Sequence, residues 1–223
     1  MNMSTGLLAK RIAPPKLKAF RDAYDRPVAI LDVGCGNHSP SITRHWFPRS
    51  SYYGLDITDR DCDPADRAAM NGFYELDLQR GDLDCVPDGG FDIIIMAHVI
   101  EHITNGEEVI QALGRKLKPS GRIYVECPSE RSLTLPSAAG TLNFRDDPTH
   151  VRFYSLTELT RACLNAGLVV QQRAVRRDKV WMAVGLLLLP RHLIALLRHR
   201  KLFGPALWDF LGFAHFVTAQ RES

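Results

Sequence analysis

The chain has 223 residues, of which 45% are hydrophobic and 24% are charged, and its formal net charge is +3. These values match an average globular protein, so they exclude a disordered, collagen-like or coiled-coil chain. The five cysteines are an odd number without a Cys-x-x-Cys pair, which predicts reduced thiols in a cytosol-like compartment rather than disulfides or a zinc clip. We therefore expect a cytoplasmic location.

Basic residues are concentrated near both ends of the chain. Residues 1–26 predict a basic helical lead, in which the apolar stretch at 6–9 is shorter than the roughly 7 to 15 residues of a secretory signal. A second basic cluster lies in the C-terminal quarter, while residues 56–92 are strongly acidic. The two clusters predict either one basic face or separate solvated helix surfaces.

Five apolar or β-branched runs predict strands. The first, at 28–33, is continuously apolar and ends at glycines, as a strand buried on both faces does. The others are residues 51–57, 72–78, 91–97 and 122–127. Helical spacing lies between most of these runs, and strands that alternate with helices predict a mostly parallel α/β sheet covered on both sides.

Two capping boxes predict helix starts. Their sequences are Thr104-x-x-Glu107 and Ser155-x-x-Glu158. They favour helices over 107–118 and 155–165, because each side chain of such a pair satisfies a backbone amide of the first turn. Residues 119–121, Pro-Ser-Gly, predict the end of the first helix, and Gly167 predicts the end of the second.

An insertion at 179–211 separates a strand at 168–174 from a last strand at 213–220. Its run of ten apolar or small residues, 180–189, is about half of the roughly 20 that a bilayer span needs. Apolar residues flanked by arginines predict a helical hairpin at a membrane surface, which would be the inner face. The alternative is a lid or a dimer face packed on the rest of the protein.

The segment after the first strand has the features of a ligand-binding turn. Residues 31–37 are Leu-Asp-Val-Gly-Cys-Gly-Asn and lead into a short helical stretch at 41–46. Gly34 and Gly36 allow backbone amides to approach a ligand closely, and a helix N-terminus favours a carboxylate or phosphate. A dinucleotide fingerprint would need a third glycine where Ser39 stands. The turn therefore predicts a nucleotide-like ligand without a pyrophosphate.

Acidic residues follow the next two predicted strands. Asp56 ends the run 51–57, where a carboxylate can accept both hydroxyls of a ribose, and Asp77 with apolar Leu78 suits an adenine. Each carboxylate by itself is more often a strand-end or turn residue than a ligand. Because open α/β sheets bind ligands at the carboxyl ends of their strands, the repetition favours a nucleoside site.

Taken in chain order, these motifs resemble the class I S-adenosylmethionine-dependent methyltransferases. The matching segments are residues 31–37, Asp56, Asp77-Leu78, residues 91–95 running into 98–103, residues 117–122 and the closing hairpin. The resemblance covers about 28–175 and 212–220 of what we expect to be a single domain, 1–223. It implies a Rossmann-like sheet of seven strands with an antiparallel last strand, and S-adenosylmethionine as the cofactor.

The resemblance also implies the cofactor contacts. These are Asp32, Gly34, Cys35, Gly36, Asp56, Ile57, Asp77, Leu78 and His98. Gly34 to Gly36 would lie beneath the methionine part, Asp56 at the ribose, and Asp77 with Leu78 at the adenine. The implied reaction is in-line transfer of a methyl group to a small or lipid-like, hydroxylated acceptor.

A hydroxyl acceptor needs a base, and four side chains are candidates. His98, Glu101 and His102 follow the fourth strand, and His150 lies in a long loop. Long loops inside a compact domain are usually functional, so His150 is the preferred base, although it could instead only pin the loop. We interpret Glu101 and His102 first as residues of the pocket floor and second as catalytic groups.

The same four residues could instead ligate a divalent metal, since Glu and His three or four apart share a helix face. A family of metal-assisted RNA 2′-O-methyltransferases has a similar Glu-x-x-Glu-His pattern with a distant His, but His98 replaces its first Glu, so we expect no metal. The sequence is also compatible with a cofactor-binding sheet without catalysis and with a peripheral membrane protein. Nucleic acid is not expected, because the basic flanks lack interleaved aromatic residues.

Overall fold

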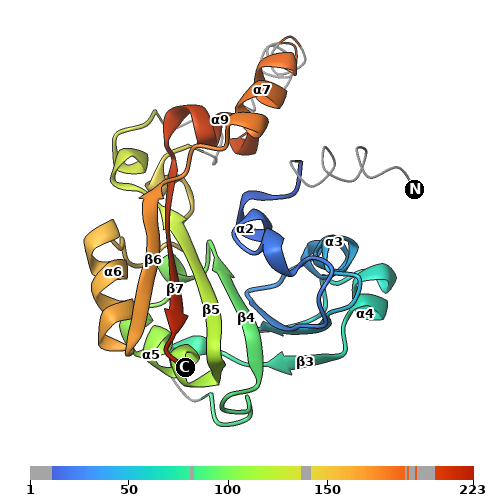
Figure 1. Ribbon diagram of the computed structural model, residues 1–223. Coiled ribbons are helices and arrows are strands. Elements are labelled where there is room, and N and C mark those ends of the chain that lie inside the picture. The colour runs from blue at the N-terminus through green and yellow to red at the C-terminus, as the bar shows by residue number, and fades with distance from the viewer. Residues whose placement is uncertain (1–11, 81–82, 137–141, 189, 191–193, 195–203) are drawn as a thin grey trace.

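The computed structural model describes residues 12–80, 83–136, 142–188, 190, 194 and 204–223. Within them, seven strands form one sheet in the order β3-β2-β1-β4-β5-β7-β6 (Figure 1). The strands are β1 (Ala29–Val33), β2 (Ser51–Asp56), β3 (Gly72–Glu75), β4 (Phe91–Ala97), β5 (Leu117–Pro128), β6 (Leu168–Val175) and β7 (Ala214–Arg221). All neighbours are parallel except β7, which is antiparallel to both β5 and β6. The predicted fold class is confirmed.

Helices cover both faces of the sheet. The α-helices are α2 (Pro15–Lys18), α3 (Ser39–Trp46), α4 (Pro64–Ala69), α5 (Gly106–Lys116), α6 (Leu156–Asn165), α7 (Lys179–Leu187) and α9 (Gly204–Leu211). Short 3-10 turns are η1 (Arg21–Ala23), η2 (Leu78–Arg80), η3 (Ile100–His102), η4 (Glu130–Leu133) and η5 (Phe144–Asp146). Figure 1 shows α5 and α6 on one side of the sheet and α2, α3 and α4 on the other.

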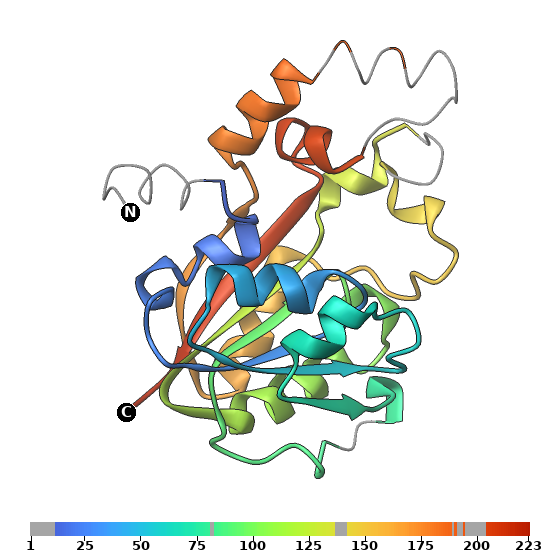
Figure 2. The same ribbon diagram turned by 90° about the vertical axis from the view of Figure 1, so that its right-hand side faces the viewer.

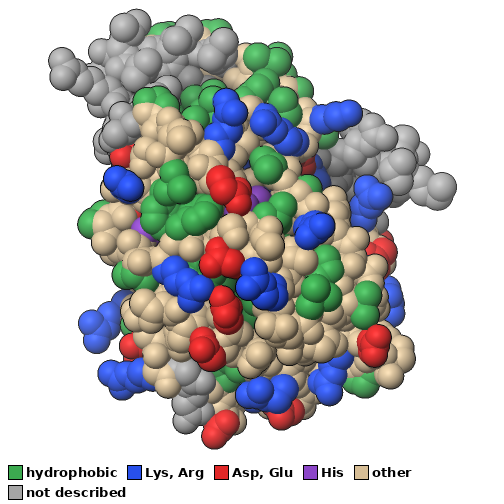
Figure 3. Space-filling model, turned by 90° about the vertical axis from the view of Figure 1, so that its left-hand side faces the viewer, with side chains coloured by type: hydrophobic (Ala, Val, Ile, Leu, Met, Phe, Trp, Pro, Cys, Tyr) green, Lys and Arg blue, Asp and Glu red, His purple; other side chains and the backbone are tan. Residues whose placement is uncertain are grey.

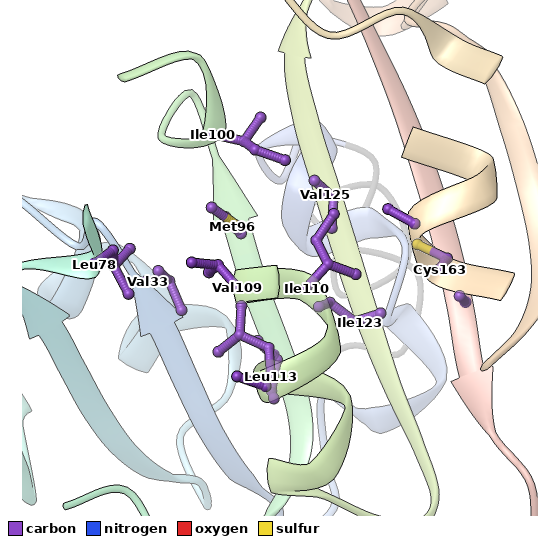
Figure 4. Close-up of a cluster of buried hydrophobic side chains, with 14 of the residues drawn as sticks. Val33, Leu78, Met96, Ile100, Val109, Ile110, Leu113, Ile123, Val125 and Cys163 are labelled. Atoms are coloured by element: carbon purple, nitrogen blue, oxygen red, sulfur yellow. The ribbon is translucent and has the colours of Figure 1, made fainter. Parts of the chain in front are cut away.

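The apolar run of β1 serves two separate cores, which explains its continuous hydrophobicity. Leu31 and Val33 face the side of α5, whereas Ile30 belongs to the cluster under α2. In the close-up of the first core, Val33 of β1 lies beside Val109 and Leu113 of α5 (Figure 4). All of these side chains are at most 1% exposed, so each core fixes the sheet from one face.

The helix predicted over 107–118 is found as α5, one residue earlier at its start, but its predicted capping box is wrong. The N-cap of α5 is Asn105, whose side chain makes no capping bond, and the helix does not use the Thr104–Glu107 pair. Instead, the Gly106 amide donates to the Tyr154 hydroxyl over 3.0 Å. A side chain distant in sequence thus satisfies the orphan donor that the local motif was expected to satisfy.

Other boundaries shift by a few residues. β3 ends at Glu75, so Asp77 lies in the turn after the strand and not at its last position. β5 begins at Leu117, directly after α5, so residues 119–121 lie within this strand instead of before it. The second capping box, Ser155 with Glu158, is confirmed as the start of α6.

The insertion before the last strand is helical where it is described. α7 and α9 pack against each other beyond the carboxyl ends of β4 and β5 (Figures 1 and 2). Residues 189, 191–193 and 195–203 of the predicted hairpin, and 1–11 of the basic lead, lie outside the described residues. None of the helices in the described ranges is long and apolar enough to cross a bilayer. The single-domain partition of 1–223 stays a prediction.

Candidate active site

In the turn after β1, Gly34 has no room for a side chain. Gly34 has a φ of +67°, and a Cβ there would lie 2.2 Å from Cγ2 of Val99. Its amide donates to the Leu55 carbonyl over 2.7 Å, which binds the turn to the end of β2. The amide of Gly36 donates to Asp56 Oδ2 over 2.9 Å. Hydrogen bonds therefore join the turn after β1 to the end of β2 at Asp56.

Asp32 and Cys35 support this turn from behind. Asp32 is 1% exposed and accepts hydrogen bonds from Ser39 Oγ at 2.6 Å and from the Tyr52 hydroxyl at 2.8 Å. The Cys35 side chain is buried beside Gly54, and burial, together with the charge of Asp32, raises the pKa of its thiol. Both side chains hold the shape of the loop.

A first cavity of about 250 Å³ opens at the carboxyl ends of β1 to β4. It is lined by Gly34, Leu55, Asp56, Ile57, Leu76, Asp77, Leu78, Gln79, His98, Val99, His102 and Ile103. The structure thus brings together six of the residues predicted to contact the cofactor. In the described part of the chain, Asp32, Cys35 and Gly36 are not among the lining residues, which differs from the expected contacts. Five lining residues were not predicted, although each adjoins a predicted motif: Leu55, Leu76, Gln79, Val99 and Ile103.

Two carboxylates face this cavity with capacity to bind. Asp56 accepts the Gly36 amide at Oδ2 and the Ile57 amide at Oδ1, 2.7 Å away, which leaves each oxygen a further lone pair. Asp77 accepts the Gln79 amide at Oδ1 over 3.0 Å. Ile57 is 66% exposed, so an apolar side chain stands at the rim next to Asp56.

A second cavity of about 230 Å³ adjoins the first. Its lining residues are His98, Glu101, His102, Pro128, Asn143, Asp147, His150, Trp208 and Phe213. It shares His98 and His102 with the first cavity, so these two rings form the common wall. The four predicted base candidates meet here. Trp208 of α9 brings an apolar ring of the insertion to this cavity, whereas Phe213 was not predicted as a site residue.

His98 lies between two carboxylates. Its Nδ1 is 3.2 Å from Glu101 Oε1 and its Nε2 is 3.0 Å from Glu126 Oε1. Burial lowers the pKa of this ring, but the hydrogen bonds to Glu101 and Glu126 outweigh burial and raise it to about 9. A ring that is protonated on both nitrogens at neutral pH has no lone pair, so the geometry argues against His98 as the base.

His150 is oriented with a free nitrogen toward the second cavity. Its Nδ1 lies 2.6 Å from the Phe144 carbonyl oxygen, which can only accept, so Nδ1 carries the proton and Nε2 the lone pair. That Nε2 is 4.0 Å from Glu101 Oε1 and 3.8 Å from Asp147 Oδ2. This arrangement matches a base whose protonated form is stabilised by adjacent carboxylates.

Glu101 and His102 complete the floor of the second cavity. Glu101 is 1% exposed, and within the described ranges its Oε2 has no hydrogen-bond partner. His102 Nδ1 is 3.0 Å from Thr149 Oγ1 and 3.2 Å from the Thr149 carbonyl oxygen. Ligand atoms of Glu101, His102 and His150 all lie within 4.8 Å of one another, a spacing that can also hold a metal ion.

A family model described as a methyltransferase domain matches residues 7–173, three quarters of the chain. The chain belongs to this family. Its superfamily is that of the class I S-adenosylmethionine-dependent methyltransferases, as the sequence resemblance predicted. Membership implies S-adenosylmethionine as the cofactor of this methyltransferase domain.

Curated relatives match only in part. The methyltransferase is 31% identical over 102 residues to the ribosomal protein L11 methyltransferase of Lactobacillus delbrueckii, which covers 45% of this chain and 32% of that protein. It is 27% identical over 153 residues to the ubiquinone biosynthesis O-methyltransferase of Nitrosococcus oceani, which covers 64% of each. The chain thus spans between a third and just under two thirds of the length of these relatives.

Solved structures share the fold at low identity. A methyltransferase dependent on S-adenosylmethionine from Mesorhizobium loti has a TM-score of 0.62 at 16% identity, with 96% of each chain covered. Another from Archaeoglobus fulgidus has a TM-score of 0.58 at 18% identity, covering 96% of this chain and 94% of that one. Likeness at this level shows the fold.

The lining of the first cavity fits the cofactor that the family implies. Leu55, Ile57 and Leu78 offer aliphatic surfaces to a ring, while the Asp56 carboxylate keeps lone pairs for hydroxyl donors. An adenosyl group needs both, because the faces of its flat base pack on apolar side chains and its ribose carries two hydroxyls. A phosphate ligand would instead be repelled by the carboxylates of Asp56 and Asp77, and the lining residues include no lysine or arginine to offset them.

Proposed function

We propose that the protein transfers a methyl group from S-adenosylmethionine to a hydroxyl of a small or lipid-like acceptor, and that the acceptor binds in the second cavity. The observation that carries this proposal is the adjacency of the two cavities across His98 and His102. Bound S-adenosylmethionine supplies an activated methyl group. Two adjoining sites would hold donor and acceptor close enough for in-line displacement, which is the main requirement of this reaction.

In this proposal His150 is the base. Its Nε2 accepts the acceptor's hydroxyl proton, while the Phe144 carbonyl holds the ring in the required tautomer. Glu101, 4.0 Å away and without a partner for its Oε2 in the described ranges, stabilises the imidazolium that forms. His98 is part of the wall, while Glu101 both lines the floor and acts together with His150.

Aromatic residues support an apolar or planar acceptor. The rings of Trp208 and Phe213 stack at 4.5 Å with an interplanar angle of 20°, and both line the second cavity. Such a wall binds flat or hydrocarbon groups, while His150, Asp147 and Asn143 of the same cavity bind polar ones. The names of the relatives in ubiquinone biosynthesis agree with an acceptor of this kind.

Metal-assisted methyl transfer to an RNA ribose hydroxyl is a second candidate, favoured by one observation. Glu101, His102 and His150 have the ligand spacing of a metal site, and Glu101 Oε2 has no partner among the described residues. The charge distribution gives it no support on the face in Figure 3, where Lys and Arg side chains alternate with Asp and Glu. A basic surface is the usual footprint of a nucleic-acid site.

One assay separates the two candidates. The purified protein is incubated with S-adenosylmethionine carrying a deuterated methyl group, together with either a metabolite and lipid extract or total RNA, with and without EDTA. We expect labelled methyl ethers in the extract, formed equally with EDTA, because a histidine base needs no metal. Label in RNA that EDTA abolishes and Mg²⁺ restores would favour the second candidate. Label only on nitrogen or carbon would contradict hydroxyl transfer.

We further propose that the insertion contacts an anionic membrane surface and so reaches a lipid-like acceptor. On the end of α7, Leu186 is 59% exposed and Leu187 is 81% exposed, and Ile194 farther along is 51% exposed. The intervening and following sequence carries arginines and a lysine, at 191, 198, 200 and 201. Exposed leucines flanked by cations suit an interfacial helix.

A flotation experiment tests the membrane contact. The variant Leu186→Glu/Leu187→Glu should remain at the bottom of a sucrose gradient with phosphatidylglycerol vesicles, whereas the unchanged protein should float, because carboxylates are repelled by the anionic surface. Leu164→Glu is the matched control, since Leu164 is 56% exposed on α6 and far from the insertion. Equal flotation of all three proteins would defeat the proposal. A change of oligomeric state in the α7 variant alone would favour a dimer face instead.

A further inference from the structure

Arg176 is a buried cation that lines neither cavity. It directly follows β6 and is 9% exposed, whereas its basic neighbours Arg173 and Arg177 are exposed. A charge at this depth has to be paired. Nε and Nη2 donate to the two oxygens of Asp209 at 3.0 and 3.3 Å, and Nη1 donates to Glu126 Oε1 at 2.8 Å.

Asp209 joins three segments through one carboxylate. It lies in α9, is 1% exposed, and accepts the Asp178 backbone amide at 3.0 Å in addition to Arg176. Asp178 is the N-cap of α7, and its side chain accepts the amides of Val180 and Trp181. Both helices of the insertion are therefore attached to the end of β6 at the same point.

Glu126 and Trp208 connect this attachment to His98, which is part of the common wall of the two cavities. Glu126 Oε1 contacts Arg176 on one side and His98 Nε2, at 3.0 Å, on the other. Trp208 adjoins Asp209 in the chain, and its ring centroid is 5.0 Å from that of His98. The guanidinium of Arg176 also lies over the Trp208 ring, 5.7 Å from its centroid.

We infer that Arg176 and Asp209 are positioning residues, which hold Trp208 of the insertion over His98 and thereby set the shape of the acceptor cavity. The inference rests on the proposed function, because that function assigns the second cavity to the acceptor. A guanidinium fork that pairs with both oxygens of a carboxylate fixes angle as well as distance, which a single point charge cannot do. Neither residue touches the reacting groups.

The test uses Trp208 as its own reporter. Trp46 and Trp181 are the other tryptophans of the chain, and Trp46→Phe/Trp181→Phe leaves Trp208 alone. Emission of Trp208 at neutral pH should be quenched by the adjacent His98 ring. In that background we compare Arg176→Met/Asp209→Leu, in which an apolar pair replaces the buried Arg176–Asp209 ion pair, while Glu126 keeps His98 as its charged partner. The matched control is Arg173→Met, an exposed arginine of β6.

The double variant should show brighter, red-shifted Trp208 emission, while Arg173→Met should not. With catechol as probe acceptor, the KM of the double variant should rise about tenfold, and by more than the dissociation constant for S-adenosylmethionine, since Trp208 lines only the second cavity. Unchanged emission in a folded double variant overturns the inference. If the double variant does not fold, Arg176→Lys replaces it, since an ammonium cannot reproduce the two-point contact of the guanidinium with both oxygens of Asp209. Unchanged emission in this variant overturns the inference equally. Because emission needs no acceptor, a protein that methylates no hydroxyl would defeat the proposed function and leave this result standing.

Discussion

Replacement of His150 by glutamine should lower the rate of methyl transfer about 10²- to 10⁴-fold, the usual contribution of a general base. The amide of glutamine can still occupy the position of the ring in the loop, but it cannot take up a proton. Affinity for S-adenosylmethionine should not change, because His150 lines only the second cavity. The measurement is single-turnover methyl transfer combined with calorimetry of cofactor binding.

His45→Gln is the control for this substitution. His45 is exposed on α3 and lies in neither cavity, so it reports any general effect of removing a histidine. A His150 variant that transfers the methyl group as fast as the control would remove the base role and leave His150 as a residue that pins the loop. Loss of both activity and cofactor affinity would instead indicate that the loop had collapsed.

Replacement of Asp56 by alanine should weaken binding of S-adenosylmethionine roughly 30- to 150-fold, which corresponds to the loss of about 2 to 3 kcal/mol from hydrogen bonds to a charged acceptor. Two contributions add up in this loss. The carboxylate no longer receives the ribose hydroxyls, and the Gly36 amide loses the oxygen that it donates to at 2.9 Å. Calorimetric titration of the variant measures the change in dissociation constant.

Two further variants show whether the loss of affinity is specific to the carboxylate of Asp56. Asp61→Ala removes an exposed carboxylate from the same loop region and should bind the cofactor as the unchanged protein does. Asp56→Asn keeps an acceptor for Gly36 and should lie between the other two. If Asp56→Ala retained full affinity, the assignment of the first cavity to the adenosyl group would be wrong.

Local chemistry was enough to predict most of the sheet and its turn. The apolar run at 28–33 indicates a strand buried on both faces. The two glycines indicate a turn with positive φ, and Asp56 is recognisable because it ends the next strand. The second capping box was predictable for the same reason, since Ser155 and Glu158 satisfy each other's backbone.

The features that the sequence did not predict have a common physical cause, which is long-range pairing. Asn105 starts α5 because Tyr154 reaches its first turn from another loop, and no spacing within 104–107 contains that information. Glu126 lies inside an apolar strand, where a charge is intelligible only with Arg176 and His98 beside it. Burial raises the pKa of Glu126, but the charge of Arg176 and the hydrogen bond from His98 bring it down to about 2.

The insertion enters and leaves the sheet through two strands that are hydrogen-bonded to each other. β6 and β7 pair from Leu168 with Arg221 to Val175 with His215, so the excursion between them starts and finishes at neighbouring positions. An insertion whose two ends lie side by side can be exchanged for another segment, because its removal leaves the hydrogen bonds between β6 and β7 intact. If the proposed acceptor cavity is correct, exchange of the insertion should change acceptor choice, with one constraint. Any transplanted segment must bring a carboxylate equivalent to Asp209, because Arg176 remains behind in the scaffold.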